Sequence, residues 1–145
     1  MPSFKGELHF LSNMYPCNIL NVYKSSEHLY QASLAANTDG HAAIIATPDG
    51  YAAKRLARKL PRRLDYEEVR VGFMAHALYL KFLYNLDLRA KLIWHEAVII
   101  EENEWHDNFW GMCTCNGCAN KIHQNKLGKL LTITREHFIN LQKTM

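Results

Sequence analysis

The sequence lacks the features that assign a protein to a function class at first reading. No apolar run approaches the roughly 20 residues that a helix needs to cross a membrane. The first residues, MPSFKGELHF, contain no basic stretch followed by an apolar one, so no signal peptide is evident. The glycine-rich phosphate patterns GxGxxG and GxxxxGK are both absent. We therefore expect a cytoplasmic protein with no membrane contact and no standard nucleotide-binding loop.

The sequence also lacks a large excess of charge of one sign. The formal net charge of +3 permits a polyanionic partner but does not require one, because nucleic-acid binders usually carry a stronger basic stripe. The sequence shows no repeat, no low-complexity tract and no linker. Its 145 residues suit one hydrophobic core, so we predict a single domain over residues 1–145.

One long helix is predicted over residues 66–84. Apolar residues recur there at three- and four-residue steps, which is typical of a helix with one buried face. Lys81 falls on the line beside this stripe, so its amine is expected at the edge of the apolar surface. The predicted buried stripe consists of Val69, Phe73, Ala77, Leu80 and Tyr84.

Shorter elements are predicted on both sides of this helix. Ser25 or Ser26 can cap a helix that runs through EHLYQASLAA. A second short helix is expected at residues 50–60 and a last one at about residues 125–141. The segments CNILNVYKSS and AVIIEE favour extended backbone. Because strands and helices do not alternate regularly, we predict a compact, helix-rich α+β fold with a small β component.

Three of the four cysteines lie in one short stretch that ends with a histidine. Cys113, Cys115, Cys118 and His123 follow the order C-x-C-x2-C-x4-H, and zinc takes four such sulfur and nitrogen ligands in tetrahedral sites. The Cys-x-Cys spacing departs from the usual fingers and ribbons. A structural zinc site is therefore one interpretation, and an exposed loop with incidental thiols is the other. No His-Glu-x-x-His element is present, which argues against a catalytic zinc.

Several charged residues have a functional and an ordinary interpretation. Glu27 falls in the first turn of its predicted helix, where it is either a functional carboxylate or a charge that the helix dipole stabilises. Asp107 precedes Phe109 and Trp110, where it is either an acid with a raised pKa or an ordinary turn residue. Basic side chains either receive phosphates or form a solvated face. The basic candidates are Lys54, Arg55, Arg58 and Lys81.

Six segments occur together in one order along the chain: GELHFLSNMYPCNI, SSEHLYQA, AKRLAR, DYEEVRVGFMAHALYLKF, IIEENEWHDNFWG and NKLGKLLTITR. In this combination the chain resembles the NADAR superfamily, also called the YbiA-like family, over residues 4–135. The resemblance implies a compact α+β domain that cleaves N-glycosidic bonds and requires no cofactor. Members of the family release ADP-ribose from modified guanine bases, and others hydrolyse phosphorylated intermediates of riboflavin synthesis.

The resemblance also implies roles for single residues. The acid of the Ser-Glu-His motif falls on Glu27, and the acid and tryptophan of Asp-x-x-Trp-Gly fall on Asp107 and Trp110, which we expect to be catalytic. Met14 and Tyr66 depart from residue types common in the family, but neither change removes a charged position. The cysteine stretch occurs in only part of the family. The positions expected to bind substrate are Asn13, Lys54, Arg58, Lys81 and Glu101.

The chemistry of glycosidic cleavage suggests how these residues act. Positive charge develops on the anomeric carbon as the C–N bond breaks, and a fixed carboxylate stabilises it or activates the attacking water. We expect Glu27 as the principal carboxylate, Asp107 as a positioning acid or base, and Trp110 as a stacking wall. The expected partner is ADP-ribosylated guanine in nucleic acid or a nucleotide, or a small riboflavin intermediate, with no protein partner evident. A non-catalytic module that binds ADP-ribose or NAD is the alternative.

Overall fold

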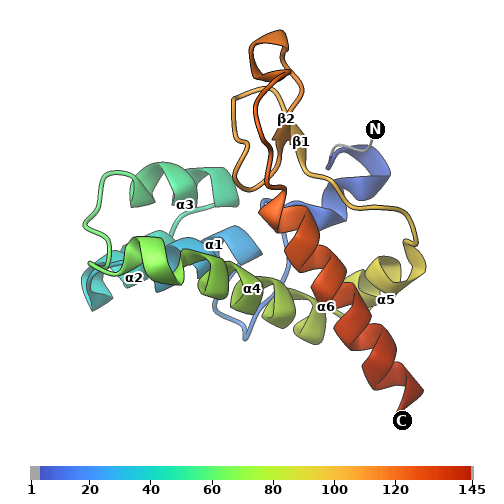
Figure 1. The fold of residues 1–145 in the computed structure, drawn as a ribbon. Helices are drawn as coiled ribbons and strands as arrows, with labels where there is room; N and C mark the ends of the chain where they lie inside the picture. Colours follow the sequence, from blue (N-terminus) through green and yellow to red (C-terminus); the bar gives the residue numbers. More distant parts are fainter. Residues whose placement is uncertain (1–3, 145) are drawn as a thin grey trace. The chain divides into compact units, whose positions relative to one another are not determined.

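The computed structural model describes residues 4–144, and this part of the chain is helix-rich with a small sheet (Figure 1). The predicted α+β fold class is confirmed. Among the described residues, no helix combines the length and apolar character that a membrane crossing needs. The chain divides into two compact units, which we call the helical unit (residues 13–88) and the split unit (residues 4–12 with 89–144). The prediction of a single domain over residues 1–145 stays a prediction.

In the helical unit, α1 packs against α2, α3 and α4 (Figure 1). The bounds are Ser26–Ser33 for α1, Thr38–Ile45 for α2, Gly50–Ala57 for α3 and Tyr66–Tyr84 for α4. Side-chain oxygens fix the starts of the first three of these helices, because each accepts a backbone N–H of the first turn. The capping residues are Ser25, Asn37 and Asp49.

Helix α4 has the predicted bounds, but its buried face differs from the predicted one. Its buried residues are Met74, Ala77, Leu78, Lys81 and Phe82, whereas Tyr84 of the predicted stripe is 51% exposed. The predicted stripe was only partly right: Ala77 is buried, but most of the buried residues lie on the adjacent apolar line, and periodicity does not say which line faces the core. Lys81 lies on the buried line and is 0% exposed, so its predicted position at the edge of the apolar surface was wrong.

The segment CNILNVYKSS does not form the extended element predicted for it. Ile19 and Tyr23 pair in an isolated antiparallel bridge, and the backbone N–H of Val22 donates to the carbonyl of Ile19. Leu20 and Asn21 between them both have a φ of 60°. Positive φ at two successive central residues is the geometry of a type I′ turn. The apolar residues favoured a strand, but the chain reverses direction at this point.

The split unit contains short strands and a long last helix. Strands β1 (Glu102–Asn103) and β2 (Met112–Cys113) pair in parallel, with Asn103 opposite Cys113. Helix α6 (Lys126–Lys143) agrees with the predicted helix to within two residues at each end. The remaining elements are the 3-10 helices η1 (Gly6–Leu11) and η2 (Asn116–Cys118) and helix α5 (Leu86–Trp94), which begins in the last residues of the helical unit.

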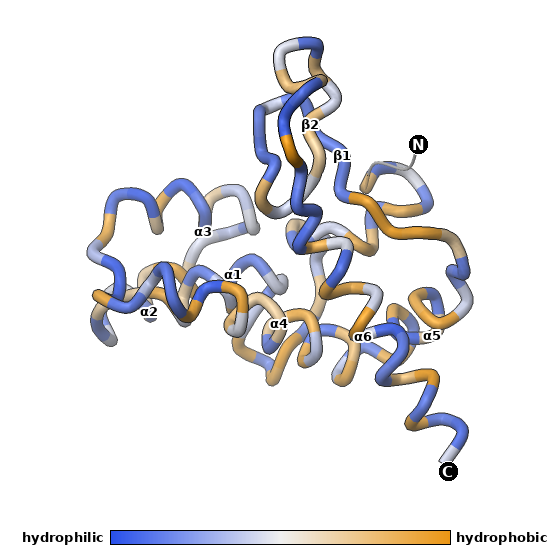
Figure 2. Tube along the Cα trace, viewed as in Figure 1, coloured by the Kyte–Doolittle hydropathy of each residue, from blue (hydrophilic) through white to orange (hydrophobic). Residues whose placement is uncertain are grey.

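The apolar run before β1, which is orange in Figure 2, was predicted as a strand or extended segment. It does not pair as a strand, and strand pairing is restricted to Glu102–Asn103. Side chains from the start and middle of α6 hold it instead. Asn125 Nδ2 donates to the carbonyl of Ile99 at 3.0 Å, and Arg135 donates to the carbonyls of His95 and Ala97.

Candidate functional site

Glu27 lies in the first turn of α1, in the helical unit. The backbone N–H of Glu27 donates to the carbonyl of Asn13 at 3.1 Å. The side-chain Oδ1 of Asn13 accepts a hydrogen bond of 2.9 Å from Ser26 Oγ. Asn13 and Glu27 are 7% and 5% exposed. Two residues that the sequence placed in separate motifs therefore lie together at the start of α1.

Burial is the largest influence on the Glu27 carboxyl group, and it raises its pKa. A hydrogen bond of 2.7 Å from Gln31 Nε2, the charge of Lys54 and a hydrogen bond from Asn13 act in the opposite direction without cancelling the effect of burial. A carboxyl group with a raised pKa exchanges its proton closer to neutral pH than an exposed one does. This is the electrostatic environment that acid–base catalysis requires.

Two residues beside Glu27 were not singled out from the sequence. Gln31 lies one helical turn after Glu27 on α1, a spacing from which the contact could have been predicted. Arg62 donates from Nη2 to Oε1 of Gln31 at 3.4 Å, and its guanidinium lies 4.6 Å from the ring centre of Tyr66. The buried Nε of Arg62 has no hydrogen-bond partner among the described residues. Because Arg62 as a whole is only half-buried and keeps an unused donor, its guanidinium is a candidate contact for an anionic substrate group.

The two basic residues predicted on α3 differ in their surroundings. Lys54 is half-buried, and its charge lowers the pKa of Glu27, which places it near that carboxylate. Arg58 is exposed at the C-cap of α3. Gly50 permits the close approach of α3, because a Cβ at this position would lie 2.7 Å from Met14 Sδ and 3.3 Å from the Cβ of Glu27. Lys54 therefore joins the group around Glu27, and Arg58 faces solvent.

Lys81 lies inside the helical unit, where burial lowers the pKa of its amine to about 8. Its Nζ is 6.0 Å from the ring centre of Tyr15 and 5.2 Å from that of Phe82. Burial raises the pKa of the neighbouring Cys17 thiol, and the charge of Lys81 acts in the opposite direction. An amine with a lowered pKa in apolar surroundings is unusual for a structural residue and typical of a functional one.

In the split unit, Asp107 organises the turn that leads to Trp110. Its Oδ1 accepts the backbone N–H groups of Phe109 at 3.1 Å and Trp110 at 2.9 Å. Asn103 holds the other side of the aspartate, since its Oδ1 accepts the N–H of Asp107 and its Nδ2 donates to the Asp107 carbonyl. The ordinary interpretation of Asp107 as a turn residue therefore accounts for its Oδ1. Among the described residues Asp107 Oδ2 accepts no hydrogen bond, so this oxygen remains available for other interactions.

Glu101 lies where β1 approaches the Asp-x-x-Trp-Gly segment. Its carbonyl accepts the N–H of Met112 at 2.8 Å, and its own N–H donates to Asn125 Oδ1 at 3.0 Å. A Cβ on Gly111 would collide with the carbonyl oxygen of Glu101 and lie 2.6 Å from its Oε2. The glycine of the motif is thus needed for the close contact with Glu101. Glu101, Asp107 and Trp110 belong to one small region of the split unit.

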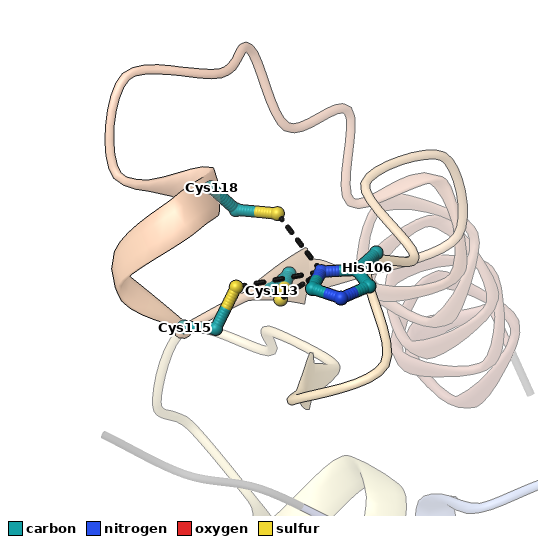
Figure 3. A group of neighbouring side chains, drawn as sticks. All are labelled: His106, Cys113, Cys115 and Cys118. Atoms are coloured by element: carbon teal, nitrogen blue, oxygen red, sulfur yellow. Dashed lines mark hydrogen bonds between the residues drawn. The ribbon is translucent and has the colours of Figure 1, made fainter.

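The three predicted cysteines come together beside this turn, but with a different histidine. The ligand atoms of His106, Cys113, Cys115 and Cys118 all lie within 4.8 Å of one another, and Figure 3 shows the three thiols directed toward the His106 ring. His123 is exposed and does not belong to this group, so the prediction of His123 as the fourth member was wrong. We call the four residues the thiol cluster.

The electrostatics of the thiol cluster differ among its members. Desolvation raises the pKa of the Cys113 thiol, but hydrogen bonds from Cys115, His106 and Cys118 outweigh it and lower that pKa to about 6. The pKa of Cys115 is raised, chiefly by its hydrogen bond to Cys113. A set of one imidazole and three thiols is a donor set that can hold a metal ion.

Comparison with known proteins gives a consistent result. The family model described as "NADAR domain" matches residues 4–139. A protein named N-glycosidase Npun_R5314, from Nostoc punctiforme, is 35% identical over 120 residues, covering 79% of this chain and 74% of the relative. N-glycosidase YbiA from Shigella flexneri is 30% identical over 118 residues, covering 80% of this chain and 71% of the relative.

A third relative is longer than this chain. "Riboflavin biosynthesis protein VVA0006" from Vibrio vulnificus is 32% identical over 132 residues, or 88% of this chain. The match spans only 35% of that protein's length. The NMR structure of the E. coli protein YbiA is similar over 100% of this chain and 86% of its own, with a TM-score of 0.82 and 26% identity.

Proposed function

The chain belongs to the NADAR family, and from this premise we propose that it hydrolyses the N-glycosidic bond of ADP-ribosylated guanine and releases ADP-ribose. The names of two relatives, both N-glycosidases, support an enzyme that acts on N-glycosyl bonds. The guanine substrate is the more specific part of the proposal and comes from the family resemblance. The cytoplasmic setting expected from the sequence also stays a prediction.

The observation that carries the proposal is the buried carboxyl group of Glu27. It is 5% exposed, burial raises its pKa, and hydrogen bonds from Gln31 and Asn13 fix its orientation. In the proposed reaction the C–N bond breaks and a water oxygen bonds to the anomeric carbon. The carboxylate of Glu27 stabilises the developing positive charge and accepts the proton of the attacking water, while the leaving nitrogen of guanine gains a proton.

The roles of Asp107 and Trp110 are proposed from the resemblance and from the turn that they form. Asp107 uses Oδ1 to hold the N–H groups of Phe109 and Trp110, which fixes the turn and leaves the second oxygen to act as a positioning acid or base. The ring of Phe109 meets that of Trp110 edge to face, with centres 4.8 Å apart and an interplanar angle of 89°. A supported indole of this kind is suited to stack on a base or to exclude water from a sugar.

Basic residues of the helical unit are proposed to hold the diphosphate. Lys54 and Arg62 both influence the pKa of Glu27, so both cations lie near that carboxylate. The unused Nε donor of Arg62 makes it a stronger candidate than the exposed Arg58. For Glu101 and the buried Lys81, the substrate-binding role expected from the resemblance remains part of this proposal.

Hydrolysis of a phosphorylated riboflavin intermediate is the second candidate. It is favoured by the name of the Vibrio vulnificus relative, although this chain spans only about a third of that protein. The two substrates share a ribose, a phosphate and a C–N bond, so the charged groups around Glu27 suit both. The specificity must then come from the contacts to the base.

Both candidates are tested by one comparison. Purified protein is given ADP-ribosylated guanosine and the phosphorylated riboflavin intermediate separately, and kcat/KM is measured for each by chromatography of the products. We expect the higher kcat/KM for ADP-ribosylated guanosine. A higher value for the riboflavin intermediate would replace the first candidate with the second. Tight binding of free ADP-ribose with turnover of neither substrate would instead indicate a non-catalytic binding module.

A further inference from the structure

We propose that the thiol cluster is a structural zinc site whose ligands are His106, Cys113, Cys115 and Cys118. The distances from His106 Nδ1 to the sulfur atoms are 3.4 Å for Cys115, 3.4 Å for Cys118 and 3.8 Å for Cys113. A tetrahedral zinc ion with its usual bond lengths to sulfur and nitrogen holds those atoms about 3.6 Å apart. The three nitrogen–sulfur distances therefore match those of a zinc site, and all four ligand atoms lie within 4.8 Å of one another around a common centre (Figure 3).

The composition of the cluster also selects the metal and its role. Thiolates with imidazole favour zinc over magnesium or calcium, which take oxygen ligands. Cys115 and Cys118 have the two-residue spacing of common zinc motifs, and the short helix η2 closes the turn between them. Four protein ligands complete a tetrahedral sphere and leave no position for water or substrate. The site is thus structural and not a source of metal-bound water.

The backbone of His106 is consistent with this assignment. His106 has a φ of 67°, a left-handed conformation that residues other than glycine adopt at a cost. This conformation accompanies a side chain directed at three thiols of the 113–118 segment (Figure 3). His106 is otherwise exposed, so burial of apolar surface does not explain its orientation. Its Nδ1 instead lies within 3.8 Å of all three sulfur atoms, which is the position that a nitrogen ligand of a shared metal ion would take.

The proposed zinc site closes the base of the turn that carries Asp107 and Trp110. His106 immediately precedes Asp107, and Cys113 donates its backbone N–H to Asn108 Oδ1 at 2.9 Å. The metal would join these two ends, because it binds both His106 and Cys113. On the other side, backbone N–H groups of residues 124–127 donate to carbonyls of residues 108–111. Zinc would therefore add a link between the two ends of the turn, beside the contacts that Asn103 and residues 124–127 already make with it.

Metal content is the first test. Protein purified with a phosphine reductant is reconstituted with zinc, dialysed against metal-free buffer and analysed by plasma mass spectrometry. We expect about one zinc per chain in the wild type and a loss of most of it in Cys115→Ser and His106→Asn. The matched controls Cys17→Ser and His123→Asn remove a thiol and an imidazole outside the cluster, and they should keep the wild-type zinc content.

Cobalt provides a check of the geometry. Bound in place of zinc by one nitrogen and three thiolates, cobalt(II) should give the intense visible bands of a tetrahedral site and a thiolate charge-transfer band, and Cys115→Ser should lose both. The proposal is overturned by a wild type that holds no zinc after reconstitution, by an octahedral cobalt spectrum, or by cluster variants that hold as much zinc as their controls. Iron in place of zinc would also overturn it.

The second test concerns the turn and does not depend on catalysis. Hydrogen exchange is compared between zinc-loaded and stripped protein, with the amides of Phe109 and Trp110 as reporters and those of α4 as the control. We expect faster exchange at the reporters alone after zinc removal. Equal exchange in both states would refute the role in holding the turn.

The effect on activity rests on the proposed function. If that function is correct, zinc removal raises KM or lowers kcat through the displaced Asp107 and Trp110. If the proposed function fails, zinc content and amide exchange still decide the metal site, so the two failures are distinguishable.

Discussion

Replacement of Glu27 by glutamine is expected to stabilise the folded chain at neutral pH while it removes the proposed catalytic charge. The wild-type carboxyl group is 5% exposed, and burial raises its pKa. The amide of Glu27→Gln has nearly the same shape and can still accept the hydrogen bond from Gln31, but it carries no charge that must lose its water. Stability gained on removal of a functional charge is the pattern expected of a site shaped for activity.

The sign of the pH dependence follows from the direction of the shift. Because the pKa of Glu27 is higher in the folded than in the unfolded chain, its contribution to stability is fully present below the unfolded-state pKa of about 4.3. The contribution is lost as pH rises through the folded-state pKa. Each unit by which the folded-state pKa exceeds the unfolded-state pKa changes the free energy of unfolding by about 1.4 kcal/mol, or the Tm by about 4 °C for a chain of this length. The stability of Glu27→Gln relative to wild type should therefore increase from nearly no difference at about pH 4 to its full value above the folded-state pKa.

The assay is thermal unfolding of both proteins, followed by circular dichroism at a series of pH values. Glu136→Gln is the matched control, because Glu136 is exposed in the middle of α6 and its neutralisation should change Tm little at any pH. A Glu27→Gln protein that is less stable than wild type at neutral pH would refute the reasoning. So would a difference in Tm that stays constant across the series.

Three further predictions concern other residues. Lys81→Met removes an amine whose pKa burial lowers from 10.5 to about 8. Between about pH 8 and pH 10.5 the unfolded chain keeps the Lys81 proton and the folded chain does not, so the free energy of unfolding of wild type should rise by up to about 3 kcal/mol relative to the variant. Urea unfolding at a series of pH values measures this rise, and its absence would contradict the lowered pKa. Asp107→Ala should lower the free energy of unfolding by about 1–2 kcal/mol, because two N–H groups lose their acceptor, and Asp107→Asn should lower it less. Equal losses for the two variants in urea unfolding would exclude the role of Asp107 in holding the turn. In calorimetry, free zinc at a thousand times its Kd should stabilise wild type by about 4 kcal/mol, whereas an equal gain in Cys115→Ser would contradict the metal site.

The elements that could be predicted from the sequence are those with strong local signals. Helix α4 begins and ends at the predicted residues because a long periodic pattern defines it, and Ser25 caps α1 as one of two predicted candidates. The burial of Lys81 could not be predicted, since it depends on which of two apolar lines faces the core. The turn at Leu20 and Asn21 was missed because tertiary context overrides the strand preference of their apolar neighbours.

The candidate site was predicted only where its residues belong to sequence motifs. Motif positions indicated Glu27 and Asp107, but not Arg62, whose contacts with Gln31 and Tyr66 and whose buried unpaired Nε depend on the tertiary structure. The histidine of the thiol cluster was assigned to His123 from nearness in sequence. The parallel pairing of β1 with β2 instead places Asn103 opposite Cys113, which brings His106 to the thiols. A contact created by the pairing of two strands ten residues apart does not follow from the spacing of the ligands alone.

The most direct test of the proposed function is the single-turnover release of ADP-ribose from ADP-ribosylated guanosine by wild type and Glu27→Gln. Both proteins are first shown to be folded and to bind the substrate. The buried carboxylate at the start of α1 predicts release by wild type and a rate at least about 100-fold lower in the variant, with binding retained. A wild type that binds without releasing ADP-ribose, or a variant as fast as wild type, would contradict it.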